Sequence, residues 1–242
     1  MLEQLHQMTS ALGVELSSDQ LDQFRRYKLG LEAWNQRVNL TSQKALERIE
    51  QVHFLDSLSL IPVLRHWAPD AQRVVDVGAG AGFPGVPIKL VLPHLHLVLV
   101  EATQKKADFL VWLVGELGLG EVEVVVRRAE DTARLSQYRE SFDVVTARAL
   151  GPLPVALELT LPLSRVGGVV VIPQRGDVAS EIRRSTLTLD ELGGKVVAVA
   201  SVSTDGLPQD SVAVVVKKEI LTPERYPRRV GIPSKRPLIT AL

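Results

Sequence analysis

The sequence contains no cysteine among its 242 residues. This absence excludes disulfide bonds, cysteine-ligated zinc and a cysteine nucleophile, and it fits a reducing compartment. No apolar run reaches the roughly eighteen residues of a membrane-spanning helix. The first residues also lack the basic and apolar regions of a signal peptide. We therefore expect a soluble cytoplasmic protein that has no contact with membranes.

The sequence also lacks an excess of charge of either sign. Its 28 basic and 28 acidic residues give a formal net charge of zero, so the molecule as a whole does not attract polyanions. Any contact with nucleic acid must come from a local basic patch. The five histidines are dispersed. The pattern predicts neither a metal site nor a nucleophilic triad.

Residues 1–70 show apolar positions at helical spacing and no pattern typical of a strand. From residue 71 onward, short β-branched runs alternate with helical segments. Single helices between strands predict right-handed crossovers and a mainly parallel, doubly wound α/β sheet. The predicted strands are 73–78, 95–101, 121–127, 142–147 and 168–173. The helices expected after them are 84–92, 104–117, 129–138, 153–164 and 178–192.

Two further strands, 195–203 and 211–219, are joined by a turn without a helix. They predict an antiparallel pair that completes a seven-stranded sheet. The chain therefore divides into a helical N-terminal subdomain (1–70), an α/β domain (71–221) and a basic, proline-rich tail (222–242).

A glycine-rich loop follows the first predicted strand. Asp76 is followed by glycine at positions 78, 80 and 82, so a ligand could lie against bare backbone at the carboxyl end of the strand. This D-x-G-x-G-x-G spacing resembles the signature of Rossmann-like methyltransferases that use S-adenosylmethionine. Two alternatives remain open at this point: a glycine-rich turn without a ligand, and a nicotinamide site with irregular spacing, whose usual pattern is G-x-G-x-x-G.

Two acids follow the next two predicted strands. Glu101 could accept hydrogen bonds from a ribose diol, with backbone groups of Ala102 and Thr103 beside it. Alternatively, Glu101 is a surface acid that caps the following helix. Ala129 and Glu130 occupy the corresponding place after the third strand. There Glu130 could equally be a first-turn helix residue favoured by the helix dipole.

Arginines follow the fourth and fifth predicted strands. Arg148 could bind a cofactor carboxylate, a phosphate or the O6 and N7 edge of guanine, and its alternative role is a surface ion pair. Arg175 lies at the same edge and could meet substrate. His53 and Asp56 are weaker candidates, because a histidine in an amphipathic helix is more often packed or capping than catalytic, with Asp56 as its hydrogen-bond partner.

The tail combines prolines with basic residues. It could lie along a phosphate backbone as an extended arm. It could equally wrap the sheet edge with solvated charges.

Several motifs together resemble one family. They are N-L-T at 39–41, H-F-L-D-S-L at 53–58, D-V-G-A-G-A-G-F-P-G at 76–85, A-R-A at 147–149, Y-P-R-R at 226–229 and G-I-P-S at 231–234. This set resembles the bacterial small-subunit rRNA guanine-N7 methyltransferases, the glucose-inhibited division protein B (GidB) family, over essentially the whole chain. The resemblance implies methyl transfer from S-adenosylmethionine to a guanine N7 of 16S rRNA, in a loop near the decoding centre of the small ribosomal subunit.

The resemblance also implies roles for individual residues. Arg148 would be the catalytic residue, closing the pocket beside the cofactor and the target base. The cofactor would be bound by Asp76, Gly78, Gly80, Phe83, Glu101, Ala102, Thr103, Ala129, Glu130 and Arg148. The rRNA would be bound by Arg175, Arg228, Arg229 and Lys235. One departure is that family members commonly carry Lys-Gly where this chain has Gln174-Arg175-Gly176.

Guanine N7 carries a free lone pair at neutral pH, so its methylation needs positioning more than a general base. We therefore expect Arg148 to orient its partner from the side, without stacking on the target ring. We also expect a monomer. The alternatives are an RNA-binding ribosome-assembly module without turnover, and a methyltransferase of this fold with another acceptor.

Overall fold

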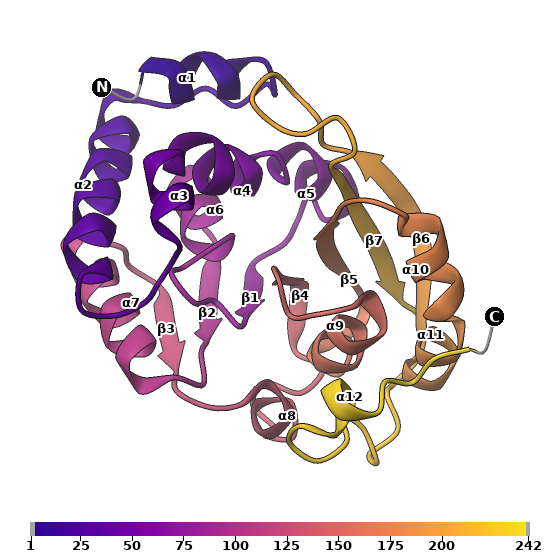
Figure 1. Ribbon diagram of the computed structural model, residues 1–242. Helices are drawn as coiled ribbons and strands as arrows, with labels where there is room; N and C mark the ends of the chain where they lie inside the picture. Colours follow the sequence, from indigo (N-terminus) through magenta and orange to yellow (C-terminus); the bar gives the residue numbers. More distant parts are fainter. Residues whose placement is uncertain (1–2, 241–242) are drawn as a thin grey trace.

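The computed structural model describes residues 3–240; residues 1–2 and 241–242, the ends of the first and last predicted segments, lie outside the described residues. A seven-stranded sheet in the order β3-β2-β1-β4-β5-β7-β6 forms its centre (Figure 1). Strands β1 to β5 run parallel, while β7 is antiparallel to both β5 and β6. The predicted α/β sheet with an antiparallel terminal pair is confirmed. The strands are β1 (Arg73–Val77), β2 (His96–Val100), β3 (Val122–Val125), β4 (Phe142–Ala147), β5 (Ser164–Gln174), β6 (Gly194–Ser201) and β7 (Val212–Lys218).

Each face of the sheet is buried under helices, because neighbouring strand residues point to opposite sides. Val74 packs in one hydrophobic core and Val75 in the other. The core that holds Val74 also contains apolar residues of α6 (Gly85–Val91) and α7 (Gln104–Glu116). The other core contains residues of the helices between β4 and β6. These are α9 (Leu153–Thr160), α10 (Val178–Arg184) and α11 (Thr186–Leu192).

The N-terminal helices pack on the same side as α6 and α7. Ser17 caps the long helix α2 through a capping box with Gln20, which fixes where that helix begins. Phe24 and Tyr27 of this helix share the core that contains Val74, so the helices of residues 3–67 cover one face of the sheet. They are α1 (Glu3–Ser10), α2 (Ser18–Asn35), α3 (Gln43–Glu47), a π-helical turn η1 (Glu50–Leu55), α4 (Asp56–Leu58) and α5 (Ile61–Trp67).

Three predicted helix boundaries were wrong. The helix expected over 153–164 ends at Thr160, because Pro162 has no N–H with which to continue the helical hydrogen bonds, and β5 already begins at Ser164. The helix expected over 178–192 is divided at Ser185. The helix expected over 129–138 is the short α8 (Ala129–Thr132), followed by turns.

The described part of the tail, residues 222–240, packs against the α/β domain beside α8, α9 and α11 (Figure 1). The Arg139 guanidinium donates hydrogen bonds to the backbone carbonyls of Thr222, at 2.7 Å, and Tyr226, at 2.9 Å. The tail then forms the short helix α12 (Ile232–Lys235), which lies against α9. Within residues 3–240, no helix has the length and apolar composition that crossing a bilayer requires.

Candidate functional site

The loop after β1 requires glycine for its backbone shape and for its close contacts. Gly78, Gly80 and Gly82 have φ values of +73°, +57° and +93°, in the left-handed region that favours glycine. A Cβ atom on Gly78 would lie 2.5 Å from the Leu150 side chain, and one on Gly82 would lie 2.6 Å from the Tyr27 hydroxyl. The loop therefore brings bare backbone to the carboxyl edge of the sheet.

Glu101, directly after β2, connects this loop to its own turn. One carboxylate oxygen accepts the Gly80 backbone N–H at 3.0 Å, and the other accepts the Thr103 N–H at 2.7 Å. The side chain is buried. Because each carboxylate oxygen has two lone-pair sites, Glu101 retains one acceptor site per oxygen for a pair of ligand hydroxyls.

A cavity of about 430 Å³ lies at this place; we call it the glycine-loop cavity. Gly78, Glu101, Ala102, Thr103, Ala129 and Glu130, all predicted from the sequence to bind a cofactor, contribute to its lining. Its size is in the range of small-molecule sites, roughly 300–1,000 Å³. Together with the free lone pairs of Glu101 and the bare backbone at Gly78, this volume fits a nucleoside cofactor such as S-adenosylmethionine. The lining also includes Lys106 and three tail residues, Val230, Gly231 and Ser234, which are not among the residues predicted from the sequence to bind a cofactor.

Four residues that were also predicted to bind the cofactor lie outside the lining of this cavity: Asp76, Gly80, Phe83 and Arg148. Asp76 is fully buried beneath the loop, where its Oδ2 accepts the Gly85 N–H at 2.9 Å. Burial raises the pKa of the Asp76 carboxyl to about 7. The structure therefore places Asp76 as a support of the glycine loop, while Gly80 acts through its N–H to Glu101.

Phe83 belongs to an aromatic stack beneath the site. Its ring is nearly parallel to that of Tyr27, at 5.2 Å between centroids, and to that of His53, at 4.5 Å. The guanidinium carbon of Arg148 lies 5.0 Å from the Phe83 ring centroid, within reach of a cation–π interaction. Phe83 thus packs against His53 and Arg148, two side chains that line the neighbouring cavity.

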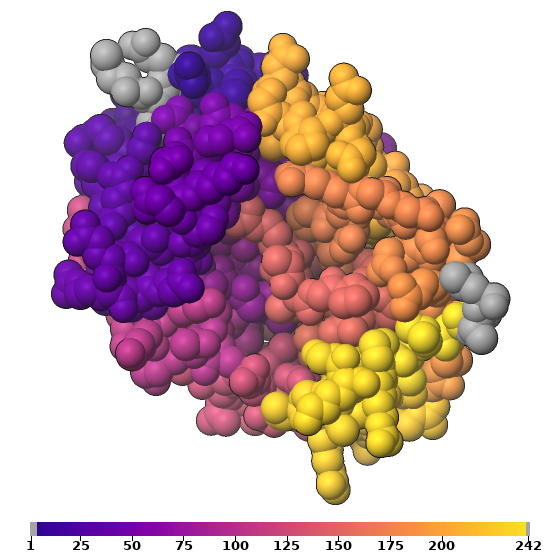
Figure 2. Space-filling model, viewed as in Figure 1, coloured from indigo at the N-terminus to yellow at the C-terminus, as the bar shows by residue number. Residues whose placement is uncertain are grey.

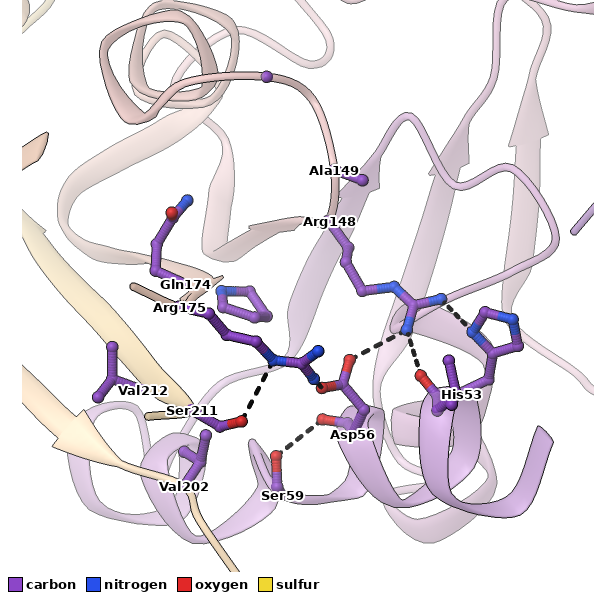
Figure 3. Close-up of a pocket in the computed structure, with 13 residues that line it drawn as sticks. His53, Asp56, Ser59, Arg148, Ala149, Gln174, Arg175, Val202, Ser211 and Val212 are labelled. Atoms are coloured by element: carbon purple, nitrogen blue, oxygen red, sulfur yellow. Dashed lines mark hydrogen bonds and ion pairs between the residues drawn. The ribbon is translucent and has the colours of Figure 1, made fainter. Parts of the chain in front are cut away.

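This second cavity, of about 400 Å³, is shown in Figure 3; we call it the arginine cavity. Arg148 and Arg175 line it together with His53 and Asp56. Ala149 lines both cavities, so the two adjoin. Ala149 also has a φ of +59°, unusual for a residue with a side chain, and such strain is typical of functional loops.

Asp56 holds both arginines. Its Oδ2 accepts from Arg148 Nη1 at 3.0 Å, and its Oδ1 accepts from Arg175 Nη2 at 2.7 Å (Figure 3). The expectation that Asp56 bonds to His53 was wrong, because the two ring nitrogens of His53 bond to Arg148 and Thr41 instead. Arg175 also donates to the Ser211 hydroxyl at 3.2 Å, and Arg148 Nη1 to the Val52 carbonyl at 3.1 Å. The sequence signal that places His53 and Asp56 in one site is their spacing, because residues three apart lie on the same face of a helix.

His53 also positions Arg148. Its Nδ1 lies 2.8 Å from Arg148 Nη2 and its Nε2 lies 2.8 Å from the Thr41 hydroxyl. Since arginine has no acceptor, Nδ1 must be unprotonated and Nε2 carries the proton. Burial, with a contribution from the Arg148 charge, lowers the pKa of His53 to about 3. The imidazole is therefore neutral at physiological pH, and it connects the N-L-T motif to Arg148.

The basic residues of the tail differ in their surroundings. Arg228 donates through Nε, at 2.8 Å, to the carboxylate of Glu158, whose side chain is fully buried. Arg229 and Lys235 are exposed. The arrangement favours a structural role for Arg228 and leaves Arg229 and Lys235 accessible to a polyanion.

Comparisons with known proteins find relatives over nearly the whole chain. The model of the family described as rRNA small subunit methyltransferase G (GidB) matches residues 20–209. A protein of Dehalococcoides mccartyi (strain CBDB1) named ribosomal RNA small subunit methyltransferase G is 45% identical over 230 residues, covering 95% of this chain and 97% of its own. One of the same name from Roseiflexus castenholzii is 42% identical over 238 residues, covering 98% of this chain and 100% of its own.

Two solved structures share the fold at low sequence identity. A mutant of MtNAS in complex with S-adenosylmethionine is 16% identical, with a TM-score of 0.52, and the match covers 90% of this chain and 78% of that one. The cyclase SpnF is 15% identical, with a TM-score of 0.51 and coverage of 68% and 81%. These likenesses concern the fold alone.

Proposed function

This chain belongs to the GidB family, rRNA small subunit methyltransferase G, and we therefore propose that it transfers a methyl group from S-adenosylmethionine to N7 of a guanine in 16S rRNA. The observation that carries this proposal is the pair of adjoining cavities that share Ala149. We assign the glycine-loop cavity to the cofactor and the arginine cavity to the target base. When bound, S-adenosylmethionine supplies an electrophilic methyl group.

The residues of the glycine-loop cavity bind and orient the cofactor. The two remaining acceptor sites of Glu101 suit the ribose hydroxyls, while its bonds to Gly80 and Thr103 hold both turns in place. Lys106 and Ala102 border the same space. Glu101 can make all of these contacts because it directly follows β2, at the carboxyl edge of the sheet.

The arginine cavity offers hydrogen-bond donors from a fixed guanidinium. Arg148 has five N–H donors, of which three bond to Val52, Asp56 and His53, so two remain for a substrate acceptor such as guanine O6. Contacts on Phe83, His53 and Asp56 hold the group from several directions, which favours orientation of the base from its edge. Arg175, with 47% of its side chain exposed, is suited to the target base or a nearby phosphate.

The reaction requires no proton to be removed from N7, because its lone pair is free. The side chains of the arginine cavity suit a reaction that needs no base. His53 is neutral and donates its only N–H to Thr41, and Asp56 is occupied by two arginines. His53 and Asp56 therefore hold the two arginines in place, and neither is arranged to act as a general base.

A substrate in the small ribosomal subunit implies a cytoplasmic location, and we propose that the protein acts there as a monomer. Two other functions are tested by the same experiment: an RNA-binding assembly module, and a methyltransferase with another acceptor. The purified protein is incubated with methyl-labelled S-adenosylmethionine and small subunits from cells that lack this gene. We expect label in 16S rRNA. Cofactor binding without label in subunits or naked rRNA would favour another acceptor, and no cofactor binding at all would favour the assembly module.

A further inference from the structure

We propose that residues 230–234 of the tail form a wall of the cofactor site and contribute to the affinity for S-adenosylmethionine. This inference rests on the proposed function, in which the glycine-loop cavity holds that cofactor. Val230, Gly231 and Ser234 line the cavity together with Gly78, Glu101 and Glu130. The tail lies over this part of the surface in the space-filling view (yellow in Figure 2).

The tail is fixed immediately before it reaches the cavity. Glu158 of α9 accepts the Arg228 backbone N–H at 2.9 Å and also binds the Arg228 guanidinium through Nε and Nη2. The Arg134 guanidinium donates to the carbonyl of Pro227. A buried, charge-assisted pair of this kind holds its backbone in one position. Residues 230–234 therefore have a defined place at the cavity.

A second contact connects the tail to the cavity lining itself. The Gly231 backbone N–H donates to Glu130 Oε1 at 2.9 Å, and Glu130 is buried in the same lining. Gly231 has a φ of +77°, which lets the chain turn into α12 at this point. Glu130 thus holds the tail against the position assigned to the cofactor.

The chemistry of the wall suits a nucleoside. Val230 offers an apolar surface, while Ser234 offers a hydroxyl that can donate to or accept from a ribose or a base. Small-molecule sites commonly combine an apolar lining with a few polar groups of this kind. The role is distinct from RNA binding by the tail, because it uses Val230, Gly231 and Ser234 and leaves the exposed charges of Arg229 and Lys235 for RNA.

The test compares two tryptophan substitutions, one within α12 and one at the residue that directly follows it. Ser234→Trp places a large ring at the cavity wall, whereas Arg236→Trp changes an exposed residue outside the lining. Binding of S-adenosylmethionine is measured by calorimetry, after thermal melting has shown that both variants fold. We expect Kd to rise about tenfold or more for Ser234→Trp and to stay within about twofold of wild type for Arg236→Trp. Equal Kd values for all three proteins would overturn the proposal.

A truncation that ends at Arg229 supplies a second measurement. It retains the pair between Arg228 and Glu158 and removes residues 230–242. We expect it to bind S-adenosylmethionine about tenfold more weakly than wild type in the same calorimetric assay. Wild-type affinity in both the truncated protein and Ser234→Trp would show that residues 230–234 do not contribute to cofactor affinity, while leaving the proposed function intact. Wild-type protein that fails to bind the cofactor would instead overturn the proposed function.

Discussion

Asp56 and Arg148 form an ion pair of 3.0 Å that connects α4, among the N-terminal helices, to the loop after β4. The pair is largely shielded, with 10% of the Asp56 side chain and 20% of the Arg148 side chain exposed. Asp56 makes a second pair with Arg175, beyond β5. The N-terminal helices therefore supply the residue that sets the positions of both arginines in the proposed base site.

Substitution of Asp56 tests this positioning role. Asp56→Asn removes the negative charge between the arginines, and we expect methyl transfer to fall by on the order of 100-fold because the guanidinium groups lose their fixed geometry. The affinity for S-adenosylmethionine should stay within about twofold of wild type by calorimetry. Asp22→Asn is a matched control, because Asp22 pairs with Arg25 and Arg26 on the exposed face of α2. Wild-type turnover in Asp56→Asn would contradict the assignment.

Arg148 is expected to be the more sensitive partner. Arg148→Ala removes the donors aimed at the target base, so turnover should fall about 100- to 1,000-fold, as for the loss of a preorganised donor. Arg148→Lys should recover little, because an ammonium group cannot reproduce the fork that bonds to Val52, Asp56 and His53. The control is Arg165→Ala, at the amino end of β5 on the opposite edge of the sheet. Near-normal turnover in Arg148→Ala would remove Arg148 from the mechanism.

Glu101 is expected to control cofactor affinity. In Glu101→Gln one acceptor oxygen becomes an NH₂ group, which faces a backbone N–H of Gly80 or Thr103. We expect Kd for S-adenosylmethionine to rise at least about tenfold in calorimetry. Glu219→Gln, an exposed acid far along the chain, should leave Kd unchanged. Equal affinities in the two variants would show that the cofactor is bound elsewhere.

The structure explains which parts of this site could be predicted. Glu101, Ala102 and Thr103 follow a strand directly, so the order of strands already places them at one edge of the sheet. The pair between Asp56 and Arg148 joins residues 92 positions apart, and the bond between Gly231 and Glu130 spans 101 positions. Local periodicity carries no information about such contacts. Helix ends were missed for a related reason, since Ser185 divides a segment whose apolar spacing continues.

Arg228 is expected to matter for stability. Arg228→Leu leaves the fully buried Glu158 carboxylate without its partner, and loss of one member of a buried pair costs about 3–5 kcal/mol. We expect a decrease of that size in the free energy of unfolding from urea titration. Arg225→Leu provides the comparison, because Arg225 pairs with Glu191 in an exposed position where ion pairs contribute little. Equal stability of the two variants would show that the Arg228 pair is dispensable.

The low pKa of His53 predicts a pH dependence of stability. Its pKa is about 3 in the folded protein against 6.5 for a free side chain, so between these values the unfolded chain binds a proton that the native state does not. The contribution of His53 to the free energy of unfolding is complete above pH 6.5 and is lost as the pH falls from 6.5 toward 3. Asp76 acts in the opposite direction, because its raised pKa lowers stability as the pH rises from 3.8 to about 7.

The two effects can be separated by comparing wild type with His53→Gln. The Asp76 contribution is common to both proteins, so the difference between their unfolding free energies isolates His53. We expect this difference to shrink as the pH falls from 6.5 to 4, and NMR titration to show a neutral His53 ring throughout that range. A His53 titration with a midpoint near 6.5 would contradict its burial against Arg148.

The most direct test of the account locates the methyl group on the rRNA. Small subunits from cells that lack this gene are methylated by the wild-type protein and, in parallel, by Arg148→Ala, and the purified 16S rRNA is then cleaved at N7-methylated guanines by reduction and mild base. We expect one new cleavage at a guanine with wild-type protein, and its loss or strong reduction with Arg148→Ala. Label in the rRNA without cleavage at any guanine would contradict methylation of N7.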